Sequence, residues 1–141
     1  MIAQPRVRID TEGPVVMVDD NEGDRIIART CFKRSKLRNP WVSLNSGAAL
    51  LEHLDRVRAG GAAMPALVLL DINMPRMTGP EALERVRAIP YFAELPVFCM
   101  LTSSTDPADR ARVERLGASG FVVKPDLPDD YVAFFDTLAE S

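Results

Sequence analysis

The 141-residue sequence predicts an α/β fold of the doubly wound type, in which helices cover both faces of a five-stranded parallel sheet. Five short apolar segments alternate strictly with five segments of helical period, as in repeated strand–helix–strand units. The most apolar segment, residues 66–70, has no polar position, which is typical of a central strand buried on both faces. The length and the composition, 47% hydrophobic and 26% charged, fit one folded domain.

Each predicted strand is an apolar run that ends where a polar residue or a turn begins. An acidic pair follows the first strand, an Asn-Pro pair precedes the second, and an aspartate follows the third. The expected strands are residues 15–18, 41–44, 66–70, 96–101 and 120–123.

The helices are predicted from apolar residues spaced three and four positions apart. Pro80 fits a first helical turn, Pro90 follows a helix end, and Asp106-Pro107 has the form of an N-cap and first helical position. A glycine pair ends the second helix, and Gly117 ends the fourth. The expected helices are residues 22–34, 49–58, 80–89, 107–117 and 127–138.

The last helix carries three aromatic rings, Tyr131, Phe134 and Phe135, on its apolar face. These rings either cover the sheet or contact a partner protein or a second copy of the chain, and the sequence leaves both alternatives open. A homodimer through this helix is therefore one of the two expectations.

Charge and hydropathy exclude several classes of function. Lysine and arginine number 17 against 20 aspartate and glutamate residues, a net charge of −3, which disfavours direct binding of nucleic acid or of an anionic membrane. No apolar run approaches the roughly 20 residues that span a bilayer, and no secretory signal opens the chain. We expect a cytoplasmic protein with an extension at residues 1–13, a domain at residues 14–141 and no attached output domain. Cys31 and Cys99 are expected to be buried free thiols, and His53 a solvated helix residue.

Polar residues follow four of the five predicted strands. Asp19 and Asp20 come after the first, Asp71 after the third, Thr102 after the fourth and Lys124 after the fifth. Ligands of open α/β sheets bind beyond the carboxyl ends of the strands, so these side chains should meet in one crevice. Each alone fits an ordinary turn or cap, but crowded carboxylates repel one another unless a cation joins them. Mg²⁺, which prefers oxygen ligands and accompanies phosphate chemistry, is the expected ion.

Four motifs, in this order along the chain, resemble the receiver domains of bacterial two-component response regulators. The resemblance spans about residues 14–138 and implies a stand-alone, CheY-like regulator with a flavodoxin-like sheet in the strand order 2-1-3-4-5. The motifs are Asp19-Asp20, Asp71-Ile72-Asn73-Met74-Pro75-Arg76-Met77-Thr78-Gly79, Leu101-Thr102-Ser103 and Gly120-Phe121-Val122-Val123-Lys124-Pro125.

The resemblance implies a role for each residue at a phosphorylation site. Asp71 would accept a phosphoryl group from a sensor histidine kinase, so that the protein is a signalling phosphoacceptor and not an enzyme for a separate substrate. Lys124 would pair with a phosphoryl oxygen, and Thr102 would donate its hydroxyl to the phosphoryl group. Phe121 would then turn inward as a switch residue, although it lacks the hydroxyl of the alternative tyrosine.

The resemblance also implies the metal ligands. Asp20 and Asp71 would bind Mg²⁺ through their carboxylates, Asn73 through its backbone carbonyl, and Asp19 would hold metal-bound water. A cis bond between Lys124 and Pro125 would direct the ammonium group into the crevice.

Two loops, residues 20–24 and 59–65, are similar to those of single-domain regulators that pair with phytochrome-type photoreceptor kinases. The resemblance therefore suggests a phytochrome-type kinase as the partner. The downstream target is not indicated by any motif of the sequence.

Three alternative functions compete with this interpretation. An enzyme of the haloacid dehalogenase type needs an acidic residue two positions after its nucleophilic aspartate, but Asn21 and Asn73 stand at that distance from Asp19 and Asp71. A flavodoxin-type cofactor module needs a first loop that cradles a phosphate, which the acidic pair would repel. A pseudo-receiver that acts as a binding scaffold stays open, and the intact set of site residues argues against it.

Overall fold

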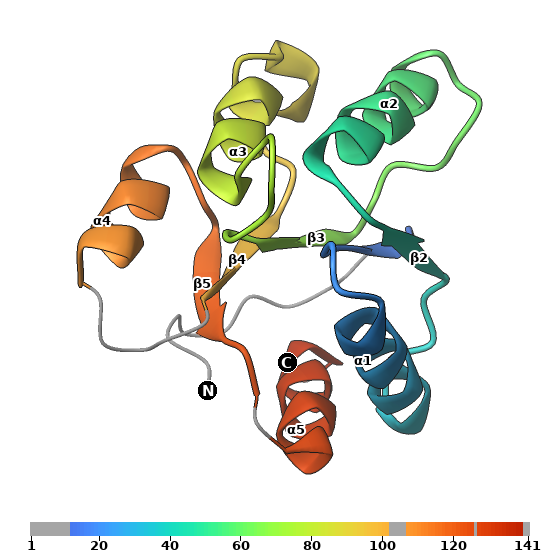
Figure 1. Cartoon of the computed structure of the whole chain (residues 1–141). Helices are drawn as coiled ribbons and strands as arrows, with labels where there is room; N and C mark the ends of the chain where they lie inside the picture. The colour runs from blue at the N-terminus through green and yellow to red at the C-terminus, as the bar shows by residue number, and fades with distance from the viewer. Residues whose placement is uncertain (1–11, 102–106, 126, 140–141) are drawn as a thin grey trace.

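The computed structural model describes residues 12–101, 107–125 and 127–139, and its centre is a five-stranded parallel sheet (Figure 1). The strand order is β2-β1-β3-β4-β5. The strands are β1 (Val15–Val18), β2 (Trp41–Leu44), β3 (Leu67–Asp71), β4 (Val97–Leu101) and β5 (Gly120–Val123). The predicted doubly wound, flavodoxin-like class and the strand order are confirmed.

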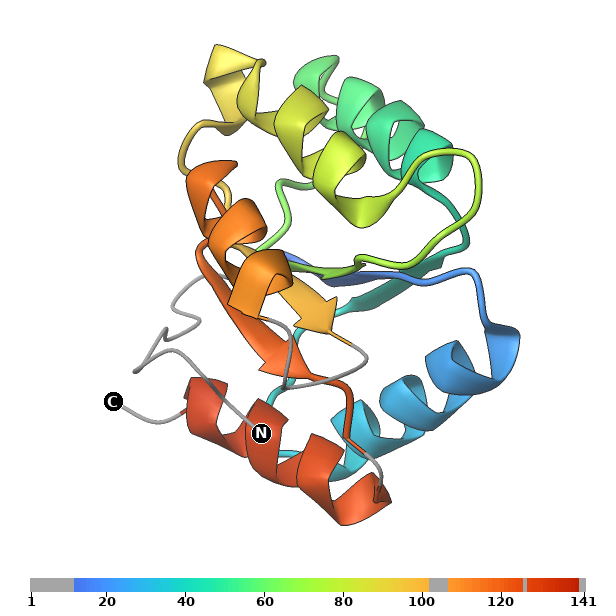
Figure 2. The same ribbon diagram turned by 60° about the vertical axis from the view of Figure 1, so that its left-hand side comes forward.

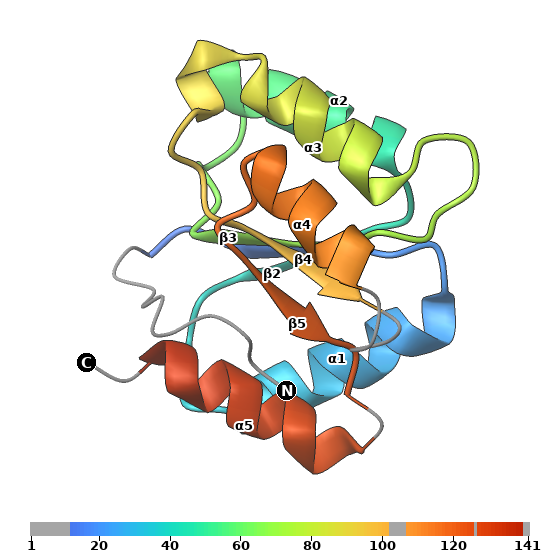
Figure 3. The same ribbon diagram turned by 90° about the vertical axis from the view of Figure 1, so that its left-hand side faces the viewer.

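Helices cover both faces of the sheet, which lies between two helical layers (Figure 3). On one face α2, α3 and α4 share an apolar core with the sheet, and on the other face α1 and α5 close a second core. Figure 2 shows α1 and α5 side by side below the sheet. The helices are α1 (Glu22–Arg34), α2 (Gly47–Arg58), α3 (Gly79–Arg87), the 3₁₀ turn η1 (Pro90–Phe92), α4 (Pro107–Arg115) and α5 (Pro128–Ala139).

The central strand β3 is buried along its whole length. It pairs with β1 on one side and with β4 on the other, and helices cover both of its faces. This environment explains why the run has no polar position before its last residue. β3 ends at Asp71, one residue later than the sequence predicts, so this carboxylate belongs to the carboxyl end of the central strand.

Helix caps explain why several element ends differ from the predicted ones by one or two residues. α2 begins at Gly47 and not at residue 49, because the Ser46 side chain accepts a hydrogen bond from the amide of Ala49. α3 begins after Thr78, whose side chain and that of Glu81 form a capping box. Thr78 therefore acts as a helix cap in the loop that follows β3.

The aromatic rings of α5 cover the sheet. Tyr131, Phe134 and Phe135 are all buried, and Phe135 meets Phe32 of α1 edge to face at 5.2 Å between ring centroids. Between the two alternatives for the rings, the structure supports packing inside the domain, and a homodimer or partner contact through the rest of this helix stays a prediction. Burial of rings from both helices explains the close association of α1 and α5.

His53 is buried, so the prediction of a solvated histidine is wrong. His53 is 8% exposed and lies on the core face of α2, three residues after Leu50 and four before Val57. Its Nε2 has no hydrogen-bond partner among the described residues, and its Nδ1 lies 3.3 Å from Arg56 Nη2. Burial and the nearby guanidinium lower the pKa of His53.

Cys31 and Cys99 are free and buried, as predicted, on opposite faces of the sheet. Burial raises the pKa of the Cys99 thiol to about 12, so this thiol is unreactive at neutral pH. None of the helices in the described parts of the chain is both long and apolar enough to cross a bilayer.

Candidate functional site

The three aspartates predicted at the strand ends lie together. β1 and β3 pair in register, with Val18 opposite Leu70, so the next residues, Asp19 and Asp71, are side by side. One carboxylate oxygen from each of Asp19, Asp20 and Asp71 lies within 4.8 Å of the other two. Asp19 and Asp71 are buried and Asp20 is exposed, so the cluster has a buried floor and one solvated carboxylate.

Backbone amides hold the two buried carboxylates in place. The amide of Asn21 donates to Asp19 Oδ1 at 2.9 Å, and the amide of Asn73 donates to Asp71 Oδ1 at 3.2 Å. In both turns the donor follows the acceptor by two residues, which leaves the second oxygen for other partners. Asp19 Oδ2 is buried and accepts no well-aligned hydrogen bond from the described residues.

Lys124 brings an ammonium group to this cluster. Its backbone amide donates to the carbonyl of Leu101 at 2.7 Å, which fixes the residue beside the end of β4. Its Nζ lies 2.9 Å from Asp19 Oδ2, 3.0 Å from Asp24 Oδ2 and 3.5 Å from Asp71 Oδ2. The contacts with Asp24 and Asp71 are hydrogen bonds, whereas the contact with Asp19 is an ion pair without hydrogen-bond alignment.

The peptide bond between Lys124 and Pro125 is trans, since the described residues contain no cis peptide bond. The cis bond that the resemblance implies is therefore wrong. The long side chain of Lys124 spans the distance from the end of β5 to the carboxylates without it.

Burial and charge shift the pKa of two groups in the cluster. Burial raises the pKa of Asp71 to about 6; Asp19 adds to this rise, and Lys124 with the Asn73 amide opposes it. Burial by itself would lower the pKa of Lys124, but the close contacts with Asp19 and Asp24 and the negative charges of Asp71 and Asp19 outweigh it and raise that pKa. Lys124 therefore stays protonated at neutral pH, while the buried Asp71 anion is poorly stabilised.

A family model for the response regulator receiver domain matches residues 15–135. The chain belongs to this family. The match begins with the first residue of β1 and ends within α5, so it includes all five strands and every acidic residue of the cluster.

Curated relatives of this receiver domain differ in length. The probable methanogenesis regulatory protein FilR2 of Methanothrix harundinacea is 28% identical over 119 residues, which are 83% of this chain and 76% of that protein. The two-component response regulator ORR1 of Oryza sativa subsp. japonica is 30% identical over 113 residues, 79% of this chain, but the match spans only 48% of its own length.

Solved structures share the fold over most of the chain. A response regulator in red light signalling of R. palustris has a TM-score of 0.80 at 26% identity, covering 89% of this chain and 90% of that one. The bacteriophytochrome response regulator RtBRR has a TM-score of 0.76 at 30% identity, covering 93% of this chain and 80% of that one. Both likenesses agree with the receiver fold.

The acidic cluster of this receiver domain fits a hard divalent cation. Its donors are all oxygens, and their 4.8 Å span is close to the about 4.2 Å between opposite ligands of an octahedral Mg²⁺ ion. The buried Asp19 Oδ2 has an ion pair with Lys124 at 2.9 Å but no aligned hydrogen bond, and metal-bound water would donate one. The amide of Asn73 is bound to Asp71, which keeps the backbone of Asn73 beside the cluster.

The loop after Asp71 passes tightly below the end of β3. A Cβ atom at Gly79 would lie 2.4 Å from the carbonyl oxygen of Asp71 and 2.5 Å from Ile72 Cα, so no larger residue fits without moving the backbone. The Gly79 amide donates to the Ile72 carbonyl at 3.2 Å. Gly79, the last residue of the Asp71 motif, thus fixes where α3 begins relative to the aspartate.

Phe121 already lies inward in this structure. It is 6% exposed, and the guanidinium carbon of Arg110 stands 5.5 Å from the centroid of its ring. The ring is inward without a phosphoryl group, so the inward turn that the resemblance implies on phosphorylation stays a prediction. Thr102, the partner expected for the phosphoryl group, lies outside the described residues.

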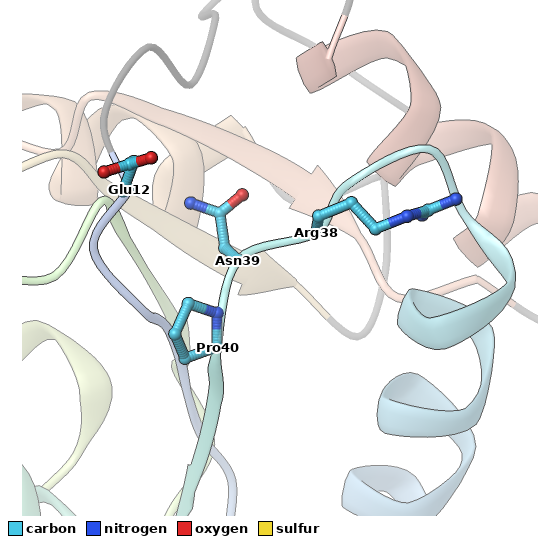
Figure 4. Close-up of a pocket in the computed structure, with 4 residues that line it drawn as sticks. All are labelled: Glu12, Arg38, Asn39 and Pro40. Carbon is cyan, nitrogen blue, oxygen red and sulfur yellow. The ribbon is translucent and has the colours of Figure 1, made fainter.

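A separate pocket lies at the opposite end of the sheet, where β1 and β2 begin (Figure 4). Glu12, Arg38, Asn39 and Pro40 line it, and Figure 4 shows Arg38 extending away from Glu12 and Asn39. Asn39 donates to the carbonyl of Gly13 at 2.8 Å, and Arg38 donates to carbonyls of its own loop. These contacts hold loops together, and the residues bring no chemistry comparable to the acidic cluster.

Sequence reasoning missed two residues of the site. Asp24 lies three positions after Asn21, the N-cap of α1, and reaches Lys124, while Arg25 donates to the backbone carbonyl of Asp19 at 2.7 Å. The available signal was the N-cap, because it places the third residue of the helix back over the turn that precedes it. Helical spacing alone places both side chains on the polar, solvated face of this helix.

Proposed function

We propose that this protein is a response regulator whose Asp71 accepts a phosphoryl group from a histidine kinase in a Mg²⁺-dependent reaction. The observation that carries the proposal is the position of Asp71, buried at the end of the central strand between two other aspartates and Lys124. This arrangement supplies both an oxygen nucleophile and the charges that position an anionic phosphoryl donor.

In the proposed reaction, a carboxylate oxygen of Asp71 attacks the phosphorus atom of the donor. An acyl phosphate bond forms, and the bond from phosphorus to the donor breaks, with the electron pair leaving on the donor. Lys124 stays protonated and pairs with a phosphoryl oxygen, which offsets the charge that gathers in the transition state. Family resemblance assigns the same phosphoryl group to the hydroxyl of Thr102, with Phe121 behind it.

Asp20, Asp71 and the backbone carbonyl of Asn73 would hold Mg²⁺, and Asp19 would hold water bound to it. The ion supplies positive charge against the incoming phosphoryl anion. The carboxylates of Asp19, Asp24 and Asp71 contact the ammonium of Lys124, and Asp20 lies beside Asp19 and Asp71. The described site therefore has an excess of negative charge. Without a divalent cation this excess repels the phosphoryl donor.

The proposed partner is a histidine kinase of the phytochrome type. Two of the similar solved structures support it, because one is a regulator in red light signalling and the other a bacteriophytochrome response regulator, at 26% and 30% identity. The family itself supports the coarser statement that the chain works in two-component signalling. We place the protein in the cytoplasm, where such kinases present their phosphohistidine.

Acetyl phosphate with Mg²⁺ tests the phosphorylation site directly. We expect intact-mass spectrometry to show the addition of one phosphoryl group, and peptide mapping to place it on Asp71. Asp71→Asn and chelation of the metal should each abolish labelling, while Asp55→Asn, an exposed aspartate of α2, should leave it unchanged. Labelling that persists in Asp71→Asn would refute the proposal, and failure of the wild type to become labelled would favour the scaffold alternative.

A further inference from the structure

Three carboxylates surround the ammonium group of Lys124 in the conformation described here. An ammonium group has three N–H donors, and three carboxylates lie within 3.5 Å of Nζ. Two of these contacts, those with Asp24 and Asp71, are hydrogen bonds, and the contact with Asp19 is the shortest ion pair. A phosphoryl oxygen that pairs with Lys124 therefore competes with these carboxylates for the ammonium group.

Exposure decides which carboxylate is released at the lowest cost. The side chain of Asp19 is 0% exposed, so losing the ammonium would leave a buried anion unpaired, whereas Asp71 loses its own negative charge when the acyl phosphate forms. The side chain of Asp24 is 38% exposed, and water can replace the lost contact. Of the two carboxylates that keep their charge, Asp24 is thus the one that Lys124 gives up.

The fold does not depend on the ion pair to place Asp24. The Asn21 side chain caps α1 and accepts a hydrogen bond from the Asp24 amide at 2.9 Å, which fixes the backbone of the first turn. Asp24 belongs to α1 and Lys124 follows β5, so their contact joins two elements at the mouth of the site. The negative charge of Asp24 can therefore be removed without removing the cap.

We propose that Asp24 is a positioning residue that holds the ammonium of Lys124 before phosphorylation and competes with the phosphoryl group for it. This inference rests on the proposed phosphorylation of Asp71. During transfer the ammonium passes from Asp24 to a phosphoryl oxygen, and Asp24 becomes solvated. Asp24 thereby slows phosphorylation, while it keeps the ammonium of Lys124 beside the carboxylates of the site.

Two matched variants test the proposal in the full chain. Asp24→Asn removes the partner of Lys124, whereas Glu22→Gln removes an equal charge from the same helical turn, at an exposed residue. At saturating Mg²⁺, we expect Asp24→Asn to raise the rate constant for phosphorylation by acetyl phosphate about three- to tenfold, and Glu22→Gln to change it less than about twofold. Asp24→Glu, which keeps the charge, should restore a rate near that of the wild type.

Nitrogen NMR of the lysine side chains reports the contact without any phosphorylation. The chain has three lysines, and Lys33 and Lys36 are exposed, so the ammonium signal of Lys124 can be distinguished after labelling with ¹⁵N-lysine. Asp24→Asn should shift the Lys124 signal and leave those of Lys33 and Lys36 in place, while Glu22→Gln should shift none of them. A purely structural role for Asp24 predicts no specific change at Lys124.

The outcomes separate this inference from the proposed function. If the wild type is labelled but Asp24→Asn reacts at the same rate, or if both variants accelerate equally, the inference is wrong and the phosphorylation of Asp71 stands. If the wild type is not labelled on Asp71, the proposed function fails and this inference fails with it.

Discussion

At the amino ends of β4 and β5, Arg87 of α3 donates hydrogen bonds to the backbone carbonyls of Phe92 at 2.7 Å and Gly117 at 2.9 Å. A further contact of 3.5 Å reaches the hydroxyl of Ser119, which itself accepts from the amide of Val97. A cation here binds neutral acceptors that the loops leave available. These hydrogen bonds to neutral groups stabilise the connections of α3, η1 and α4, and they gather no excess of one charge at this end of the sheet.

At the carboxyl ends of the same sheet, the cation Lys124 faces several carboxylates, and Asp19 keeps a buried oxygen without an aligned donor. Burial also raises the pKa of Asp71 to about 6. At neutral pH this side chain is therefore an anion that its buried position destabilises. In this comparison the polar groups at the amino ends are paired, whereas the groups for which we propose phosphoryl chemistry carry an excess of negative charge. Variants at each end should therefore change stability in opposite directions.

The largest expected effect is at the amino ends. Arg87→Ala removes hydrogen bonds from a charged donor to two carbonyls, and we expect the free energy of unfolding in urea to fall by about 3 kcal/mol. Arg85→Ala, at an exposed position of the same helix, should change it by less than about 0.5 kcal/mol. Equal losses in the two variants would show that the Arg87 contacts do not stabilise the loops.

A substitution at the carboxyl ends of the strands should raise the free energy of unfolding. Asp71→Asn replaces a buried anion by a neutral group, so without metal at pH 7.5 we expect the free energy of unfolding to rise by about 2 kcal/mol. Asp55→Asn on the exposed face of α2 serves as the control and should be near neutral. A loss of stability in Asp71→Asn would mean that Lys124 stabilises the anion more than burial destabilises it.

The sign of the pH dependence follows from the same shift. The pKa of Asp71 is raised from 3.8 to about 6, so between these values the folded chain binds more protons than the unfolded chain. This group therefore makes the fold lose stability as the pH rises from about 4 to 6, and its contribution is constant above that range. The advantage of Asp71→Asn should vanish below about pH 4, which urea unfolding across this range can verify.

The comparison also explains what the sequence can predict. Strand ends in an open parallel sheet meet at one edge, so the convergence of Asp19, Asp20 and Asp71 followed from their positions after apolar runs. In the same way, the doubly wound class followed from the alternation of apolar strand segments with segments of helical period. Both depend on chain topology, which repeats across many sequences.

The parts that could not be predicted depend on side-chain reach between distant elements. Asp24 and Lys124 are 100 residues apart, and their contact needs both the start of α1 and the end of β5 in place. The Arg87 contacts likewise join a helix to loops 5 to 32 residues away. The burial of His53 was missed for another reason. Its spacing of three residues from Leu50 places it on the core face of α2, whereas its polarity favours the surface.

A bound Mg²⁺ ion should offset part of the excess negative charge at the carboxyl ends of the strands. At a concentration of Mg²⁺ about ten times its dissociation constant, we expect the free energy of unfolding of the wild type to rise by about 1.4 kcal/mol. Asp20→Asn and Asp71→Asn each remove a proposed ligand, so the same Mg²⁺ concentration should stabilise them less. Thermal unfolding with Mg²⁺ or chelator measures this, and an equal gain in all three proteins would show that the ion binds elsewhere.

The smallest effect concerns His53, a buried titratable group outside both ends of the sheet. Burial and Arg56 lower its pKa, so the folded chain binds fewer protons than the unfolded chain below about pH 6.5. His53 therefore makes the fold lose stability as the pH falls below about 6.5, in the direction opposite to Asp71. His53→Gln removes the titration, so its free energy of unfolding should fall less between pH 7.5 and 5.5 than that of the wild type. In Asp71→Asn, where the opposing group is absent, the loss over the same interval should be larger than in the wild type. If the two variants change in the same direction, the pH dependence does not come from these two groups.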